Sequence, residues 1–86
     1  MDIIKLIAIV KKKILSQINV EHINIEDKSF LHKDHPGNNS SKFHLKVTLK
    51  SVELKNMSKI ESNKKIYKIL SYELKEFIHS IQILII

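Results

Sequence analysis

Five histidines and no cysteine define the metal chemistry open to this chain of 86 residues. Imidazole is a common metal ligand, whereas disulfides, cysteine-ligated zinc and thiol catalysis all need a thiol that the chain lacks. His32 and His35 form an H-x-x-H pair within a polar segment. By itself this pair is a weak metal signal, because two histidines on a polar loop are more often simply solvated.

The sequence contains no recognisable catalytic motif. It shows no nucleophile–base pair, no glycine-rich phosphate loop and no two carboxylates at catalytic spacing. The acidic residues number 9 and the basic residues 15, all of them lysine, so the net charge is +6. We therefore predict that the protein is not an enzyme.

The first half of the chain predicts one helix, one short strand and a long loop. The helix spans residues 2–17 and is marked by apolar residues every three or four positions, namely Ile3, Ile7, Val10, Ile14 and Ile18. Residues 22–27 alternate as a strand that begins at His22. The polar stretch at about 28–42 carries the only proline and the only glycine, which indicates a long mobile loop.

The clearest strand signal lies in residues 43–51. Phe43, Leu45, Val47 and Leu49 point to one face and predict contact with a core. The intervening side chains face the opposite way and predict a basic, solvated sheet face. His44 belongs to that wet face, where we expect no chemical role for it.

A second helix is predicted to begin at the capping box that starts with Ser58 and ends with Glu61. Its apolar stripe is Ile66, Leu70, Leu74, Phe77 and Ile78. His79 ends this helix, and residues 81–86 then predict a largely buried strand. The order helix, strand, strand, helix, strand predicts an α+β fold, with a three-stranded mixed sheet and both helices on one face.

The length allows one small domain, residues 1–86, with about 64% of its surface buried. The apolar start at residues 3–10 is too short to span a membrane and lacks the basic segment that precedes a signal sequence. We expect a cytoplasmic protein that does not associate with membranes and is monomeric when alone.

Several segments, taken in order, resemble the BolA family. They are Ile25-Glu26-Asp27-Lys28-Ser29, His32 and His35, Phe43-His44-Leu45-Lys46-Val47, Ser51, Ile66-Tyr67-Lys68-Ile69-Leu70, Glu73-Leu74 and Ile78-His79-Ser80-Ile81. The family fold is similar to class II KH domains and agrees with the order of elements predicted above. The chain departs from the family at Ser62-Asn63-Lys64, where the family has Arg-His-Arg, and at Lys28, Leu54 and Asn56.

The resemblance implies a protein partner and a shared cofactor. BolA-like proteins pair with monothiol glutaredoxins and share a two-iron two-sulfur cluster with them, in cluster trafficking or in iron and redox regulation. The resemblance assigns the ligands of this chain to His79 and His32, with His35 as the alternative loop ligand, while the glutaredoxin cysteine and glutathione supply the rest. Imidazole ligates iron in mixed clusters, and the absence of cysteine favours a shared site over one held by this chain alone. The isolated chain is expected to carry no cofactor.

Two other functions remain open. The first is a nucleic-acid-binding transcriptional regulator of the kind linked to stress responses, using a basic KH-like surface made of Lys46, Lys50, Lys55, Lys59 and Lys64. KH domains clamp the backbone with a GXXG loop, which a chain whose one glycine is Gly37 cannot form, so we expect weak and nonspecific DNA binding. The second is a metal-free adaptor, for which glutaredoxin binding would not depend on His79.

Overall fold

The computed structural model describes residues 1–29 and 42–86. Seven elements follow one another, namely α1 (Ile3–Gln17), β1 (His22–Asp27), β2 (Phe43–Lys50), α2 (Val52–Lys55), α3 (Lys59–Ile69), α4 (Ser71–Glu76) and β3 (Ile78–Ile85). The loop predicted to be mobile falls mostly on residues 30–41, which lie outside the described part. Within the described part, no helix is both long and apolar enough to cross a membrane.

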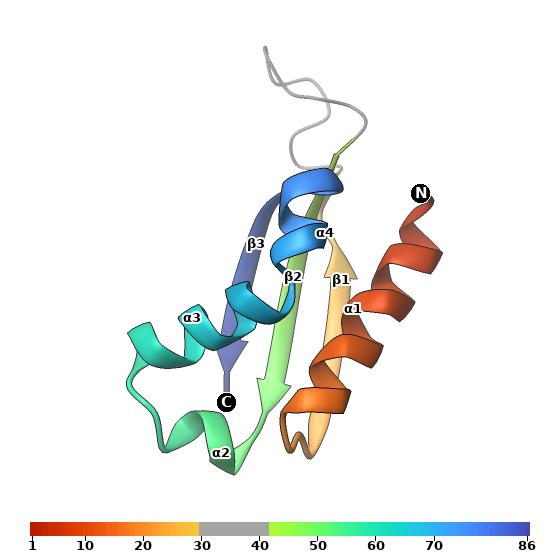
Figure 1. Ribbon diagram of the computed structural model, residues 1–86. Coiled ribbons are helices and arrows are strands. Elements are labelled where there is room, and N and C mark those ends of the chain that lie inside the picture. The colour runs from red at the N-terminus through yellow and green to blue at the C-terminus, as the bar shows by residue number, and fades with distance from the viewer. Residues whose placement is uncertain (30–41) are drawn as a thin grey trace.

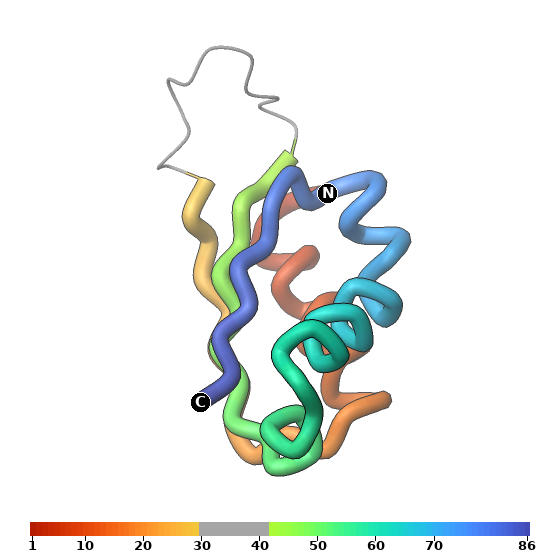
Figure 2. The backbone as a smooth tube through the Cα atoms, turned by 90° about the vertical axis from the view of Figure 1, so that its left-hand side faces the viewer, coloured from red at the N-terminus to blue at the C-terminus, as the bar shows by residue number. Residues whose placement is uncertain are grey.

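The three strands form one mixed sheet in the order β1-β2-β3. The central strand β2 pairs antiparallel with β1, from His22 opposite Lys50 to Asp27 opposite Leu45. It pairs in parallel with β3, which a helical crossover makes possible. The helices α1 to α4 lie on one side of the sheet, and no element of the described residues covers the other side, which we call the open face (Figures 1 and 2). The predicted α+β fold is confirmed.

The core lies between the helices and the covered face of the sheet. The central strand contributes Leu45, Val47 and Leu49, each at most 3% exposed. The helices also contribute buried aliphatic residues to this core, namely Leu6, Val10 and Ile14 from α1, Leu54 from α2 and Ile66 from α3. The predicted core positions Leu45, Val47 and Leu49 are therefore confirmed. Of the apolar stripe predicted for residues 2–17, Val10, Ile14 and Ile18 are buried as predicted, whereas Ile3 and Ile7 are only partly buried and Leu6 lies in the core instead.

Polar side chains close the ends of three helices. Asp2 accepts a hydrogen bond from the Lys5 amide, and Ser58 accepts one from the Glu61 amide, as the capping signals predict. Ser51 caps the short helix α2, which the sequence did not predict, and its hydroxyl donates to the Asn19 carbonyl. The single turn of α2 is too short to show a helical period, so pattern reasoning could not find it.

The second half of the helical region differs from the prediction in two ways. The predicted continuous helix breaks at Leu70, whose φ and ψ of −100° and 17° separate α3 from α4. The last strand begins at Ile78, three residues before the predicted start at Ile81. Ile78 is 2% exposed and lies opposite Phe43, so pairing with the central strand and burial both favour strand at this point. As a result His79 lies within a strand and does not end a helix.

Two ion pairs join elements that are distant in sequence. Lys13 on α1 bonds the Glu73 carboxylate on α4 at 2.6 Å, and Glu73 is 3% exposed. Lys65 on α3 bonds the Glu53 carboxylate on α2, also at 2.6 Å. The hydrogen bond from Lys65, helped by one from the Asn19 amide, lowers the pKa of Glu53 below its ordinary value of 4.5. These pairs fix the helices against one another on the covered side of the sheet.

Candidate functional site at a bulge in the last strand

A bulge interrupts the pairing of β3 with β2. Phe43 lies opposite Ile78, but the next residue, His44, lies opposite Ser80. His79 is therefore an extra residue that has no partner position on the central strand. Bulges of this kind re-aim side chains and are common beside functional sites. Here the bulge sets the direction of one of the histidines singled out from the sequence.

His79 and His44 lie side by side at this bulge. Their ring centroids are 4.9 Å apart and the ring planes are inclined by 46°. The two residues differ in burial, because His79 is exposed whereas His44 is only 4% exposed. One imidazole is thus available to a partner and is backed by a second imidazole that is held inside the protein.

Several hydrogen bonds fix His44. Its Nδ1 lies 2.7 Å from the hydroxyl oxygen of Ser80, the residue that follows His79. Its backbone N–H donates to the Ser29 hydroxyl, and its carbonyl accepts from the Lys28 amide. The backbone of His44 is therefore tied to the residues that follow β1, and its buried ring is tied through Ser80 to the bulge in β3.

The expectation that His44 is solvated is wrong, because the residue is 4% exposed. Strand alternation predicts the sheet face correctly but says nothing of what covers a given position on that face. The bulge in β3 brings two residues against the ring of His44, namely His79 and Ser80. Part of the open sheet face is consequently buried and polar.

A shallow cavity of about 350 Å³ adjoins this pair on the open face of the sheet. Its lining includes His44, Ser80 and Gln82, together with the ammonium-bearing side chains of Lys28 and Lys46. Lys28 also lies 3.4 Å from the Glu26 carboxylate. The cavity beside the histidine pair is thus lined by polar and apolar side chains together, the apolar ones being Leu45 and Ile81, and it carries two lysines.

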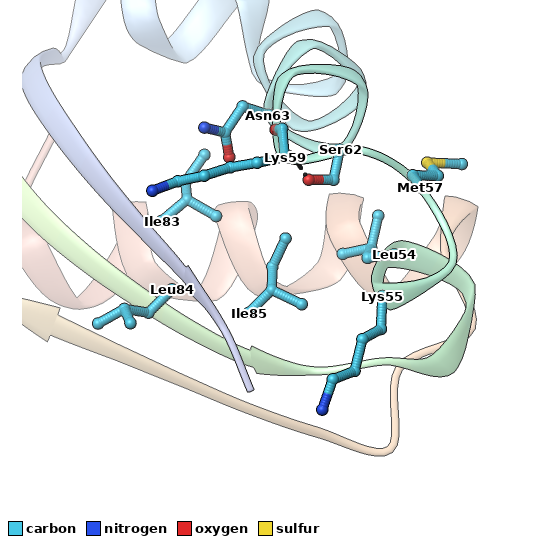
Figure 3. A pocket seen from close by; sticks show the side chains of 9 residues that line it. All are labelled: Leu54, Lys55, Met57, Lys59, Ser62, Asn63, Ile83, Leu84 and Ile85. Carbon is cyan, nitrogen blue, oxygen red and sulfur yellow. Dashed lines mark hydrogen bonds between the residues drawn. The ribbon is translucent and has the colours of Figure 1, made fainter.

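The other site residues predicted from the sequence lie elsewhere. His32 and His35 fall in residues 30–41, outside the described part of the chain. Of the five lysines proposed for nucleic-acid binding, Lys46 borders the histidine cavity, whereas Lys55 and Lys59 line a different cavity, between the helices and β3 (Figure 3). Two further positions are exposed, Lys50 at the end of β2 and Lys64 on α3. The lysines are therefore divided between at least two surfaces.

Sequence reasoning missed the pairing of His44 with His79 and the role of Ser80. The signal that could have found them is the parallel alignment of the two segments Phe43-His44-Leu45 and Ile78-His79-Ser80. Both segments begin with a large apolar residue that is followed by histidine. When the two segments pair as parallel strands, the histidines come together. The extra residue at the bulge could not be seen in either segment alone.

The possible metal ligands of this site are compatible with a metal cluster that is held jointly with another molecule. In residues 1–29 and 42–86, no group of three or more His, Cys, Asp or Glu side chains is placed to hold a metal ion. The exposed imidazole of His79 can offer one ligand, and the chain contains no thiolate. These residues fit a cluster that takes most of its ligands from elsewhere.

The fold and the site together define a small α+β domain whose open sheet face displays a histidine on a strand bulge. A family model described as BolA-like protein matches residues 14–86. The chain belongs to the BolA family. It is 32% identical over 73 residues to a protein of Haemophilus influenzae named DNA-binding transcriptional regulator BolA, with 85% of this chain and 68% of that protein covered.

Solved structures of the same family share the fold. The BolA domain of SufE1 from Arabidopsis thaliana superposes with a TM-score of 0.76 and 22% identity, covering 91% of this chain and 86% of that one. The solution structure of BolA1 from Mus musculus gives a TM-score of 0.72 and 22% identity over 90% of this chain and 60% of that one. These similarities establish the arrangement of elements that carries the histidine pair.

Proposed function

We propose that this protein is a non-enzymatic partner of a monothiol glutaredoxin and shares a two-iron two-sulfur cluster with it. In this proposal His79 ligates the cluster, and His32, or alternatively His35, supplies the second ligand from this chain. The glutaredoxin cysteine and glutathione supply the others. The observation that carries the proposal is the exposed imidazole of His79, displayed by a strand bulge on the open face of the sheet.

The backbone around His79 supports this role. The residues on either side of it pair with the central strand, Ile78 with Phe43 and Ser80 with His44. A ligand held on a paired strand loses less conformational freedom on complex formation than a ligand on a flexible loop. We therefore assign the dominant contribution from this chain to His79.

His44 acts, in this proposal, as a positioning residue and not as a ligand. Its ring backs the ring of His79 at 4.9 Å and holds Ser80 through Nδ1. Groups that orient a metal ligand commonly change metal affinity by about 10–100-fold when they are removed. Because His44 contacts His79 through its ring and not through a direct hydrogen bond, we expect an effect at the lower end of that range.

The experiment that tests the proposal is direct mixing. The purified protein is combined with a monothiol glutaredoxin homodimer loaded with its cluster and glutathione. The proposal expects a heterodimer on size-exclusion chromatography and a changed visible absorption and circular dichroism spectrum. If the glutaredoxin homodimer keeps both its mass and its spectrum, the proposal fails.

A prediction for the positioning role uses Ser80, which is exposed and can be changed with little risk to the fold. Ser80→Ala removes the hydroxyl that holds the Nδ1 atom of His44. We expect cluster retention in the heterodimer to fall about tenfold under chelator challenge, because the bulge no longer holds the two rings together. The readouts are the loss of visible absorbance with time and the thermal midpoint, which should change little. A fall in thermal midpoint with unchanged cluster retention would show that the bond is only structural.

DNA binding is a second candidate function, and the name of the Haemophilus influenzae relative favours it. The lysines offer charge for phosphate contacts, although the structure divides them between surfaces. A duplex titration at several salt concentrations separates the two candidates. Binding through phosphates predicts a steep linear fall of log affinity with log salt, and that fall should not depend on His79.

A further inference from the structure

The strand β3 forms an edge of the sheet, and its outer side is unpaired. Figure 2 looks toward this edge, and no described strand pairs with the outer side of β3, although α3 lies close to it on the covered side of the sheet. The amide of Ile86 donates to the Leu49 carbonyl of the central strand. In a parallel pair, the peptide groups of alternate residues face the partner strand, so those of Ile81, Ile83 and Ile85 face away from the sheet. Within the described chain, none of these groups is bonded to another element.

The sequence of this edge lacks the features that usually block strand addition. Proteins commonly protect an edge strand with lysine, proline or inward-pointing charge. Residues 78–86 contain neither proline nor any Lys, Asp or Glu side chain. The segment is also rich in isoleucine, a strong strand former. The edge is therefore chemically competent to pair with a further strand.

A cavity of about 300 Å³ opens beside the C-terminal half of the same edge (Figure 3). Its apolar walls come from Leu54 and Met57 on one side and from Ile83 and Ile85 on the other. The volume is large enough for an apolar side chain of a segment lying along the strand. An added strand would present such side chains at every second position.

Two lysines border this cavity. Lys55 on α2 and Lys59 on α3 both line it and are exposed. Among the residues that the structure describes, neither lysine forms an ion pair, whereas Lys65 nearby in sequence is paired with Glu53. Within the described part of the chain, the edge of β3 therefore combines unpaired peptide groups, an adjoining apolar cavity and two lysines without an acidic partner.

We propose that the outer edge of β3 is a docking surface for an extended, acidic segment of a partner protein, which adds to the sheet as a fourth strand. The backbone of the segment bonds to the peptide groups of Ile81, Ile83 and Ile85. An apolar side chain of the segment enters the cavity, and flanking carboxylates meet Lys55 and Lys59. This mode gives affinity through main-chain bonds and specificity through the side-chain pocket and the charges.

Charge and composition favour this occupant over two others. A second copy of the chain would bring another net charge of +6 to the edge, so self-association is opposed by repulsion. Single-stranded nucleic acid would use stacking on aromatic side chains or a GXXG clamp. The cavity lining contains no aromatic residue, and the connection from Lys55 to Ser58 contains no glycine.

The test is a titration of the full chain with a labelled heptapeptide of alternating glutamate and valine. We expect saturable binding by fluorescence anisotropy and NMR shifts concentrated at the amides of Ile81, Ile83 and Ile85. Lys55→Glu together with Lys59→Glu should weaken binding at least about tenfold. The matched control, Lys11→Glu together with Lys12→Glu on the distant helix α1, changes the net charge equally and should weaken binding far less.

Two altered peptides and one oligonucleotide complete the test. A peptide methylated at alternate backbone nitrogens should lose binding, because it cannot complete the ladder, and a peptide with lysine in place of glutamate should not bind. Equal binding of the methylated peptide, or no saturable binding of the parent peptide, would overturn the proposal. It would also be overturned if a single-stranded DNA 12-mer bound this edge more tightly than the peptide, or if sedimentation showed the chain to dimerise through it.

Discussion

The variant His79→Ala is expected to abolish the cluster spectrum of the glutaredoxin heterodimer while leaving the fold intact. The side chain is exposed, and its backbone is held by strand pairing on both sides, so its loss removes a ligand without opening the core. No other described histidine is positioned to replace it, because His44 is buried behind it. His32→Ala should only weaken the cluster and alter its spectrum, since His35 lies three residues away on the same segment.

The matched control for this prediction is His22→Ala. His22 is also exposed and also lies in a strand, but it is at the start of β1, opposite Lys50 and far along the sheet from the bulge. It should leave the spectrum unchanged. Acid should release the wild-type cluster, because protons compete with metal for imidazole nitrogens. If His79→Ala keeps a wild-type spectrum and the same acid lability, the metal-free adaptor takes the place of the shared cluster.

A second large effect is expected from Ile66→Ala, which should lower the free energy of unfolding by about 2–5 kcal/mol. Ile66 is 0% exposed and lies in the core between α3 and the sheet. Truncation removes buried apolar surface and leaves a cavity that close-packed neighbours cannot fill completely. Small domains are marginally stable, so this loss is a large share of the total. Urea denaturation followed by circular dichroism gives the midpoint and the slope.

The control for this prediction lies on the same helix. Ile60→Ala makes the identical chemical change at a position that is 69% exposed, and we expect a change within about 0.5 kcal/mol. The pair therefore separates burial from helix propensity. Equal losses at the two positions would mean that α3 does not pack on the sheet as described.

The elements of this fold could be predicted from sequence wherever one face of an element is apolar along its whole length. The helix α1 and the strand β2 both satisfy this condition, and their alternating or helical periods gave the right type and nearly the right bounds. The boundary at Ile78 could not be predicted, because Phe77 and Ile78 continue the apolar stripe of the preceding helix. Only pairing with Phe43 decides that Ile78 is in a strand.

Only those parts of the candidate site that leave a local pattern in the sequence could be predicted. His79 could be singled out because its segment matches the BolA pattern and because it interrupts an apolar run. The environment of His44 could not be predicted, since it is formed by the bulge and Ser80 in β3 and by Ser29, which follows β1. Such long-range contacts leave no period in the sequence. The division of the basic residues between two surfaces is likewise a consequence of topology, as Lys46 and Lys59 are on opposite sides of the sheet.

The most direct test of the shared cluster is to detect the imidazole nitrogen on the iron. The protein is labelled with ¹⁵N-histidine only, combined with unlabelled glutaredoxin and glutathione, and the cluster is reduced and studied by pulsed electron paramagnetic resonance. Ligation by His79 predicts a strong ¹⁵N coupling from this chain that diminishes in His79→Ala and persists in His22→Ala. A heterodimer whose reduced cluster shows no ¹⁵N coupling from this chain would contradict the account.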